Sequence, residues 1–307
     1  MIEINLSILN QSYSRRMGWY PPVSNPEVAP QRISGIEEIL DQFDLIMLDS
    51  YGVLCRGMKA INGAVDAIAM MRERGKTFSV VSNDTMTNQY VAAEKYAARG
   101  FDFANEEVVT SLDVTESWLP TLEDPSRWGV IAPQPHPTDK LLEGTTSLNA
   151  CNGVIPDHVD SILFMVGTGW TQEMQDNLEA SAKGRQFTMA VGNPDMGAPY
   201  YIDGNIHINA TPGYFMDQLV EATGQKATPL LFGKPGKAIF QTVAERHGVT
   251  DPSRVLMVGD TLYTDILGGN AMGFKTLLLE CGIYKGTDVN QAIADAGIAP
   301  DFIAPHL

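Results

Sequence analysis

Short apolar runs alternate with longer segments of mixed polarity along most of the chain. Residues 45–48 are all apolar and stop at Asp49, a pattern typical of a parallel strand buried on both faces. Residues 64–74 then have the pattern of a helix that ends at Gly75, and residues 77–81 have the pattern of the next strand. This alternation predicts a parallel sheet of the α/β class.

The last third of the chain repeats the alternation. Residues 229–232, 255–258 and 275–279 are predicted strands, and residues 237–247 and 266–272 are predicted helices. The two ends of the chain therefore predict pieces of one doubly wound, three-layer sheet of the Rossmann-like kind.

The domain organisation follows from these two regions. We predict a core formed by residues 33–124 and 229–307, with residues 125–228 inserted as an α/β cap. Prolines punctuate residues 1–32, which are predicted to be a loosely structured N-terminal arm. The predicted elements of the cap are strands at 128–132, 162–166 and 187–191 and a helix at 172–182.

Charge and composition narrow the set of partners. The 307 residues carry 21 Lys and Arg against 37 Asp and Glu, a net charge of −16. Such a charge repels phosphate backbones and anionic membrane surfaces, so neither nucleic acid nor a membrane is an expected partner. Three widely spaced cysteines and the lack of any long apolar run predict a soluble cytoplasmic protein with reduced thiols.

Four polar segments follow predicted strands. In an open parallel sheet the loops at the carboxyl ends of strands converge on the ligand crevice. The segments are Asp-Ser-Tyr-Gly-Val at 49–53, Ser-Asn-Asp at 82–84, Gly-Lys-Pro at 233–235 and Gly-Asp-Thr-Leu-Tyr-Thr-Asp at 259–265.

In order and spacing, these segments resemble the four motifs of the haloacid dehalogenase superfamily, in its phosphatase branch. The segment Gly-Asn-Pro-Asp at 192–195 is similar to the Asn-Pro-Asp of class IIA caps in that superfamily. The resemblance extends from about residue 33 and implies a Mg²⁺-dependent hydrolase that acts on a small phosphorylated metabolite. It also implies a homodimer, with the active site between core and cap.

The residue types suit this chemistry. A carboxylate such as Asp49 can attack phosphorus and form an aspartyl phosphate, and the meeting of two anions calls for a hard divalent cation. Asp49 and Asp260 are the predicted direct Mg²⁺ ligands. The resemblance adds the backbone carbonyl of Tyr51, and Asp265 is placed to order a metal-bound water. The ammonium of Lys234 would pair with Asp49 and with phosphoryl oxygens.

The remaining candidates would contact the substrate. Ser82 Oγ and the Asn83 backbone amide are predicted to donate hydrogen bonds to the phosphoryl oxygens. Asp84 is either a catalytic acid or a helix-capping residue, because Asn-Asp-Thr before a helix is a good capping sequence. Asn193 and Asp195 either contact the substrate or form a turn.

Tyr51 departs from the pattern of the family. In most phosphatases of the superfamily this position holds a second Asp that protonates the leaving group. A phenol with a pKa of about 10 is a poor base near neutrality, and loss of a general acid–base lowers rates by roughly 10²–10⁴-fold. Slow turnover of ordinary phosphate esters is therefore expected, unless Asp84 or a cap residue replaces the acid or the leaving group needs no proton.

Two alternatives stay open at this point. Asp-x-Tyr-Gly also resembles the first motif of 2-haloacid dehalogenases, which attack carbon without a metal. Those enzymes carry a helical cap after the first motif, whereas about thirty residues separate Asp49 from Ser82, and Asp260 and Asp265 have no use in a metal-free site. The other alternative is a non-catalytic binder of phosphorylated metabolites, although retention of Asp49 and Lys234 argues against it.

Overall fold

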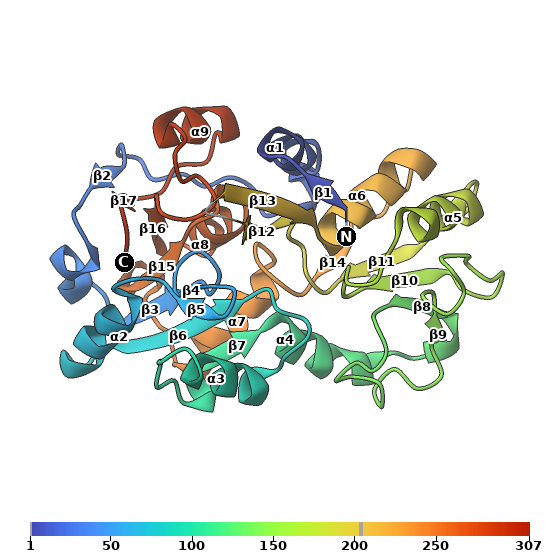
Figure 1. Ribbon diagram of the computed structural model, residues 1–307, viewed down its shortest axis with the longest axis horizontal. Coiled ribbons are helices and arrows are strands. Elements are labelled where there is room, and N and C mark those ends of the chain that lie inside the picture. The colour runs from blue at the N-terminus through green and yellow to red at the C-terminus, as the bar shows by residue number, and fades with distance from the viewer. Residues whose placement is uncertain (1, 203–204) are drawn as a thin grey trace. The chain divides into compact units, whose positions relative to one another are not determined.

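The computed structural model describes residues 2–202 and 205–307, and the chain divides into two compact units (Figure 1). The core unit comprises residues 20–82, 89–110 and 234–307. The insert unit comprises residues up to Trp19 together with residues 83–88 and 111–233.

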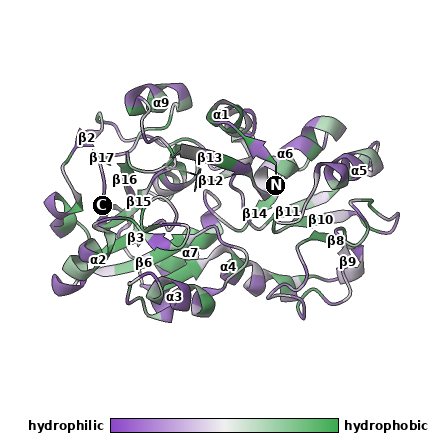
Figure 2. Ribbon diagram, viewed as in Figure 1, coloured by the Kyte–Doolittle hydropathy of each residue, from purple (hydrophilic) through white to green (hydrophobic). Residues whose placement is uncertain are grey.

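The core unit is built on a seven-stranded sheet in which every neighbouring pair of strands is parallel. The strand order is β2-β17-β16-β15-β3-β6-β7. All residues of β3 and β15 are buried, which explains why both read as uninterrupted apolar runs (Figure 2). The strands are β2 (Gln31–Arg32), β3 (Leu45–Leu48), β6 (Thr77–Ser82), β7 (Val108–Thr110), β15 (Val255–Gly259), β16 (Lys275–Leu279) and β17 (Phe302–Ala304).

The strand order reverses between β3 and β15. From β3 the chain builds outward through β6 and β7 on one side, and through β15, β16 and β17 on the other. Ligands of open α/β sheets bind outside the carboxyl ends of the strands at such a reversal. The structure therefore places the end of β3 and the end of β15 at the point of the sheet where this fold class binds ligands.

Helices complete the core unit, and the α/β fold class is confirmed. Helix α7 packs against β6 and β7, and helix α8 packs against β16. The helices are α2 (Ala64–Glu73), α3 (Gln89–Ala97), α7 (Lys237–Arg246), α8 (Leu267–Ala271) and α9 (Val289–Ala296), with a hairpin of β4 (Cys55–Arg56) and β5 (Lys59–Ala60). The short turns are η2 (Ile36–Glu38), η3 (Leu40–Gln42), η4 (Asn105–Glu107), η7 (Pro252–Arg254) and the π-helical turn η8 (Leu262–Ile266).

The insert unit has a parallel sheet of its own, with strand order β14-β11-β10-β8-β9. Phe164 of β10 stacks on Phe215 of α6, with ring centroids 5.5 Å apart, in the core of this unit. The elements are β8 (Trp128–Ile131), β9 (Thr146–Ser147), β10 (Ser161–Phe164), β11 (Thr188–Val191), β14 (Leu230–Leu231), α4 (Ser111–Trp118), η5 (Leu119–Thr121), η6 (Pro125–Arg127), α5 (Gln172–Ala182) and α6 (Pro212–Thr223).

The boundaries of the insert differ from those expected from the sequence. Strand β14 was expected in the core sheet, but Ala190 and Val191 of β11 pair with Leu230 and Leu231. Residues 111–124, also expected in the core, belong to the insert unit. A two-residue strand carries no pattern that specifies its partner, so sequence alone could not assign it to one sheet.

The N-terminal segment also differs from the loosely structured arm that the prolines suggested. It forms β1 (Glu3–Ile4), α1 (Leu6–Arg15) and the turn η1 (Met17–Trp19). Asn5 caps α1 by accepting the Ile8 N–H at 2.9 Å, and the buried residues Leu9 and Tyr13 are spaced four apart on one helix face. Strand β1 pairs with β13 (Asn205–Ala210), which pairs with β12 (Gly197–Ile202). The prolines lie only after this helix.

Within the described residues, no helix combines the length and the apolar character needed to cross a bilayer.

Candidate active site

Asp49 is positioned by the sheet of the core unit. It follows β3 directly, and its backbone N–H donates to the carbonyl of Val258 in β15 at 2.9 Å. In the same register Leu48 pairs with Val258, so the end of β3 is held against the end of β15. The Asp49 side chain is buried at this edge.

Asp260 and Asp265 are held by the loop that follows β15. Oδ2 of Asp265 accepts the backbone N–H groups of Asp260 (3.2 Å) and Thr261 (3.1 Å), while Oδ1 of Asp260 accepts the Thr261 hydroxyl at 3.0 Å. Asp265 lies on η8, a single π-helical turn. The sequence predicted an ordinary helix over 266–272, but η8 precedes α8 here, and such π-turns recur at functional sites.

Glycines let the backbone approach the carboxylates. Gly52 has φ of +100°, and a Cβ at this position would overlap the Asp260 carboxylate. A Cβ at Gly282 would overlap the same side chain, and the neighbouring Ile283 N–H donates to Asp260 Oδ2 at 2.8 Å. The sequence analysis missed this contribution of residues 281–283. These residues follow β16, a strand of the core sheet. The rule that loops at the carboxyl ends of parallel strands converge on the ligand crevice would therefore have predicted their part in the site.

Lys234 joins the carboxylates in the core unit. Its Nζ forms an ion pair with Asp49 Oδ1 and lies 2.8 Å from Asp265 Oδ1. Only 2% of the Lys234 side chain is exposed, so these charges interact with little screening by solvent. Three buried carboxylates, those of Asp49, Asp260 and Asp265, have ligand oxygens that all lie within 4.8 Å of one another.

The electrostatics of this cluster follow from its burial. Burial raises the pKa of Asp49 to about 6, although the Lys234 ammonium opposes the shift. Burial and the charges of Asp49 and Asp265 also raise the pKa of Asp260 well above its ordinary value. Burial alone would lower the pKa of Lys234, but the two carboxylates that it contacts outweigh this effect and hold its pKa above the ordinary value.

A divalent cation fits this set of donors. One ammonium faces three carboxylates, so the cluster lacks positive charge, and all three side chains offer the hard oxygen ligands that Mg²⁺ prefers. The acids come from adjacent strands at the reversal of the sheet. Of the described residues, Asp49, Asp260 and Asp265 form the one group of His, Cys, Asp or Glu side chains close enough to share an ion.

Two further predicted residues lie in the core unit. Tyr51 is partly exposed, and its backbone bridges that of Cys55. Ser82 ends β6, the strand next to β3, and is buried. The strand order therefore places Ser82 and Asp49 at the carboxyl ends of neighbouring strands.

The other predicted residues lie in the insert unit, where the structure brings three of them together. Asn83 Nδ2 donates to Asp195 Oδ1 at 2.9 Å, and Asn193 Oδ1 accepts the Asp195 N–H at 3.0 Å. The second bond is that of an Asx turn, so the turn interpretation of Asn193 and Asp195 describes their local structure. Asp84 Oδ1 accepts the Met86 N–H at 2.6 Å, which closes an Asx turn, and α3 begins only at Gln89, so this bond is not a helix cap.

Comparisons with known proteins agree with this geometry. A family described as haloacid dehalogenase-like hydrolase matches residues 46–142, and a second, HAD-hydrolase-like family matches residues 231–307. The chain is 26% identical to glycerol-3-phosphate phosphatase of Gallus gallus over 285 residues, covering 86% of this chain and 89% of the relative. It is 25% identical to phosphoglycolate phosphatase 1A of Arabidopsis thaliana, covering 90% and 78%.

A solved structure shows the same fold. The crystal structure of a protein described as a possible sugar phosphatase from Cytophaga hutchinsonii matches with a TM-score of 0.74 at 22% identity, covering 91% of this chain and 98% of that one. This likeness shows the α/β fold, and the two family matches place the chain among hydrolases. The chain belongs to the haloacid dehalogenase-like hydrolases, which confirms the resemblance carried by the four motifs.

Proposed function

We propose that this hydrolase is a Mg²⁺-dependent phosphatase that removes phosphate from a small metabolite through an aspartyl phosphate on Asp49. The observation that carries the proposal is the convergence of Asp49 with Lys234 and two further buried carboxylates at the reversal of the core sheet. The phosphatase names of the relatives support it.

Asp49 and Asp260 would hold the Mg²⁺, with the backbone carbonyl of Tyr51 as the resemblance implies. When bound, the ion supplies the positive charge that lets a carboxylate and a phosphate dianion approach each other. Asp265 accepts two backbone N–H groups of the loop after β15 and forms an ion pair with Lys234. It would therefore orient this loop and the Lys234 ammonium in addition to facing the cation site.

The first chemical step uses residues of the core unit. An Asp49 oxygen forms a bond to phosphorus while the bond from phosphorus to the leaving oxygen breaks, and the departing oxygen takes up a proton. Lys234 holds the attacking carboxylate and balances charge on the phosphoryl oxygens. Ser82 Oγ and the backbone amide of Asn83 would donate to the same oxygens.

The second step is hydrolysis of the aspartyl phosphate. Water adds to phosphorus, the bond to Asp49 breaks, and inorganic phosphate and a proton leave. Tyr51 stands where the superfamily's phosphatases carry the acid that assists both proton transfers. The proposal therefore includes slow turnover of esters whose leaving group needs a proton.

The test is phosphate release from p-nitrophenyl phosphate and from sugar, nucleotide and cofactor phosphates, with and without EDTA. Release that needs metal and is abolished by Asp49→Asn supports the proposal. Phosphate binding without release would instead indicate the non-catalytic binder. Halide release from 2-haloacids that resists EDTA would indicate the dehalogenase.

Several parts of the sequence-based account stay predictions. These are the class IIA type of the insert, its role as a cap over the active site, the homodimer and the cytoplasmic location. Size-exclusion chromatography with light scattering would test the dimer directly.

A further inference from the structure

A buried tyrosine hydroxyl contacts the turn that follows Asp49, and none of the steps above uses it. The Tyr96 O–H donates to Ser50 Oγ at 2.7 Å, and both side chains are buried in the core unit. Tyr96 belongs to α3, whereas Ser50 is the residue directly after the proposed nucleophile. A buried hydroxyl needs a partner, but many groups would satisfy it, so the choice of Ser50 calls for an explanation.

The ring of Tyr96 is fixed from several sides. Its centroid lies 5.3 Å from that of Phe103 and 6.3 Å from that of Phe101, in both cases edge to face. The Tyr96 carbonyl accepts the backbone N–H groups of Arg99 (2.9 Å) and Phe101 (3.1 Å), just past the end of α3. The Tyr96 hydroxyl is therefore a rigid support for the residue that it contacts.

Ser50 connects this support to Cys55. Ser50 Oγ lies 3.7 Å from Cys55 Sγ, and the Cys55 thiol donates to the Ser50 carbonyl, also at 3.7 Å. Because Tyr96 is the donor to Ser50, the Ser50 hydroxyl proton can point to the sulfur, so that each of the three groups donates once. The Ser50 carbonyl also accepts the backbone N–H groups of Leu54 (2.9 Å) and Cys55 (3.0 Å). The turn 50–55 is thus closed around Ser50.

The closed turn sets the direction of the Tyr51 carbonyl. The Gly52 N–H donates to the Cys55 carbonyl at 3.0 Å. The Tyr51 C=O and the Gly52 N–H belong to one planar trans peptide, in which the two groups point in opposite directions. The position of Cys55 therefore directs the Tyr51 carbonyl away from Cys55. Gly52 also lies against the Asp260 carboxylate, which a Cβ on this glycine would overlap, so the peptide borders the cluster of acids.

We propose that Tyr96 is a positioning residue for the metal site: through Ser50 and Cys55, its hydroxyl holds the Tyr51 carbonyl in the orientation that meets the cation. The inference rests on the proposed function, in which this carbonyl is a Mg²⁺ ligand. It adds that Mg²⁺ affinity depends on a hydroxyl outside the set of ligands. Replacement of residues that orient metal ligands typically lowers metal affinity by about 10–100-fold.

The test measures the Kd of Mg²⁺ by calorimetry, without substrate, for the wild-type protein and for Tyr96→Phe. This variant removes the hydroxyl and keeps the ring that packs against Phe101 and Phe103. The hydroxyl acts on the ligand through two further side chains, so we expect the Kd to rise by about tenfold, the lower end of that range. In phosphatase assays the Mg²⁺ concentration for half-maximal rate should rise by a similar factor, while kcat at saturating Mg²⁺ stays within about twofold.

Ser50→Ala tests the route of the effect. It removes the acceptor of the Tyr96 hydroxyl, so it should raise the Kd of Mg²⁺ as Tyr96→Phe does. The Kd of the double variant should lie within about twofold of the weaker single variant, because both changes break one connection. Hydrogen exchange in EDTA gives a readout without metal: the amides of Gly52, Leu54 and Cys55 should exchange faster in Tyr96→Phe than in the wild-type protein.

Ser79→Ala is the matched control for the loss of a buried hydroxyl contact. Ser79 is buried in the same unit, and its Oγ lies 2.8 Å from His247 Nε2. This variant should lower Tm as Tyr96→Phe does, because each loses one buried hydrogen bond. It should change neither the Kd of Mg²⁺ nor the exchange of the three amides. A rise in Kd equal to that of Tyr96→Phe would show that the effect reflects stability alone, and would overturn the inference.

The outcomes separate the two proposals. A wild-type protein that binds Mg²⁺, with an unchanged Kd in Tyr96→Phe, overturns the positioning role and leaves the proposed function intact. Additive effects of Tyr96→Phe and Ser50→Ala on the Kd overturn the positioning role in the same way. A wild-type protein that binds no Mg²⁺ and releases no phosphate from any ester overturns the proposed function, and the inference with it.

Discussion

The charge imbalance of the acid cluster leads to a prediction about stability that does not depend on turnover. Asp260→Asn removes one of three buried carboxylates that face a single ammonium. We expect the variant, free of metal, to be more stable than the wild-type protein. An active-site substitution that stabilises the fold would show that these carboxylates are retained at a cost in stability.

The size of the effect can be worked from the geometry. The ligand oxygens of the cluster lie within 4.8 Å of one another, and two unit charges at that distance repel by about 3.5 kcal/mol at an effective dielectric constant of about 20. Protonation of the raised-pKa carboxyls relieves part of this repulsion. The asparagine oxygen can still accept the Ile283 N–H, so we expect a net gain of about 2 kcal/mol.

The assay is thermal unfolding at pH 8 in EDTA and again in excess Mg²⁺. A gain of this size should raise Tm by several degrees, at about 2–4 °C per kcal/mol. Mg²⁺ should stabilise the wild-type protein by about 2.7 kcal/mol at one hundred times its Kd, and the variant far less. Asp157→Asn, at an exposed position, should change neither value. The prediction is refuted if Asp260→Asn is less stable than the wild-type protein in EDTA and gains as much stability from Mg²⁺ as the wild-type protein does.

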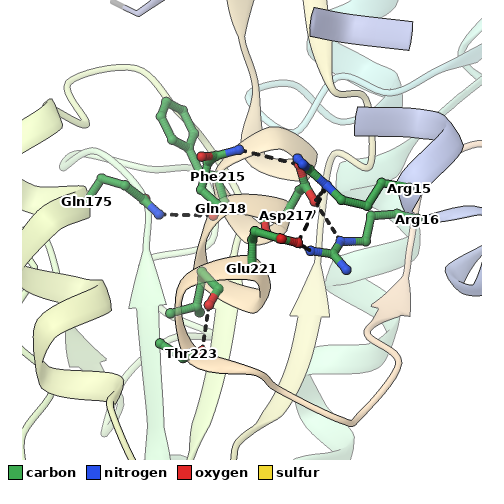
Figure 3. Close-up of polar contacts among 9 residues, drawn as sticks. Arg15, Arg16, Gln175, Phe215, Asp217, Gln218, Glu221 and Thr223 are labelled. Carbon is green, nitrogen blue, oxygen red and sulfur yellow. Dashed lines mark hydrogen bonds and ion pairs between the residues drawn. The ribbon is translucent and has the colours of Figure 1, made fainter. Parts of the chain in front are cut away.

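Three further predictions concern other parts of the chain. Arg16→Ala should lower the free energy of unfolding, measured in urea, by about 2 kcal/mol, and Arg15→Ala should lower it by about 1 kcal/mol. The difference is expected because Arg16 is the more buried partner of Asp217 (Figure 3). Equal losses of unfolding free energy in the two variants would contradict this prediction. Burial lowers the pKa of His247, so the unfolded chain takes up a proton before the folded one as pH falls from 7 to 5. His247→Gln should lessen the resulting loss of stability, as measured by urea unfolding at both pH values. Tyr51→Asp should raise the turnover of phosphate esters, and an unchanged or lower rate would assign the tyrosine another role.

The histidine experiment needs a control for the Gln substitution itself. His306→Gln changes an exposed residue near the C-terminus and should leave the pH dependence unaltered. A wild-type and a His247→Gln protein with the same loss of stability between pH 7 and pH 5 would contradict the prediction.

The core strands were predictable because each is buried on both faces and ends at a polar residue. That signal gave Leu45–Leu48 and Lys275–Leu279 at the bounds that the structure shows, and the rule that loops meet at the carboxyl ends of strands indicated that Asp49 and Asp260 would lie together. The grouping with Asp265 followed from the spacing of the same loop.

Other features depend on partners far away in the chain. The N-terminal helix has only two buried apolar residues on its face, and Arg15 and Arg16 at its end form ion pairs with Asp217, some two hundred positions later. Strand β14 has two residues, too few for a pattern. The hairpin of β12 and β13 was missed because a proline interrupts β12 and polar residues interrupt β13. The cavity that Ile2, Asp84 and Phe215 line within the insert unit likewise brings together segments far apart in the chain, and no pattern in the sequence predicts that they meet.

The most direct test of the proposed chemistry is to trap the aspartyl phosphate. The Mg²⁺-loaded protein is mixed with a phosphate ester that it hydrolyses, and the reaction is quenched with acid within the first turnover. Mass spectrometry then gives the mass of the peptide that contains Asp49. The proposal predicts a phosphoryl group on Asp49 in the wild-type protein and none in Asp49→Asn. Phosphate release at the same rate with an unmodified Asp49 peptide, or release that survives Asp49→Asn, would contradict it.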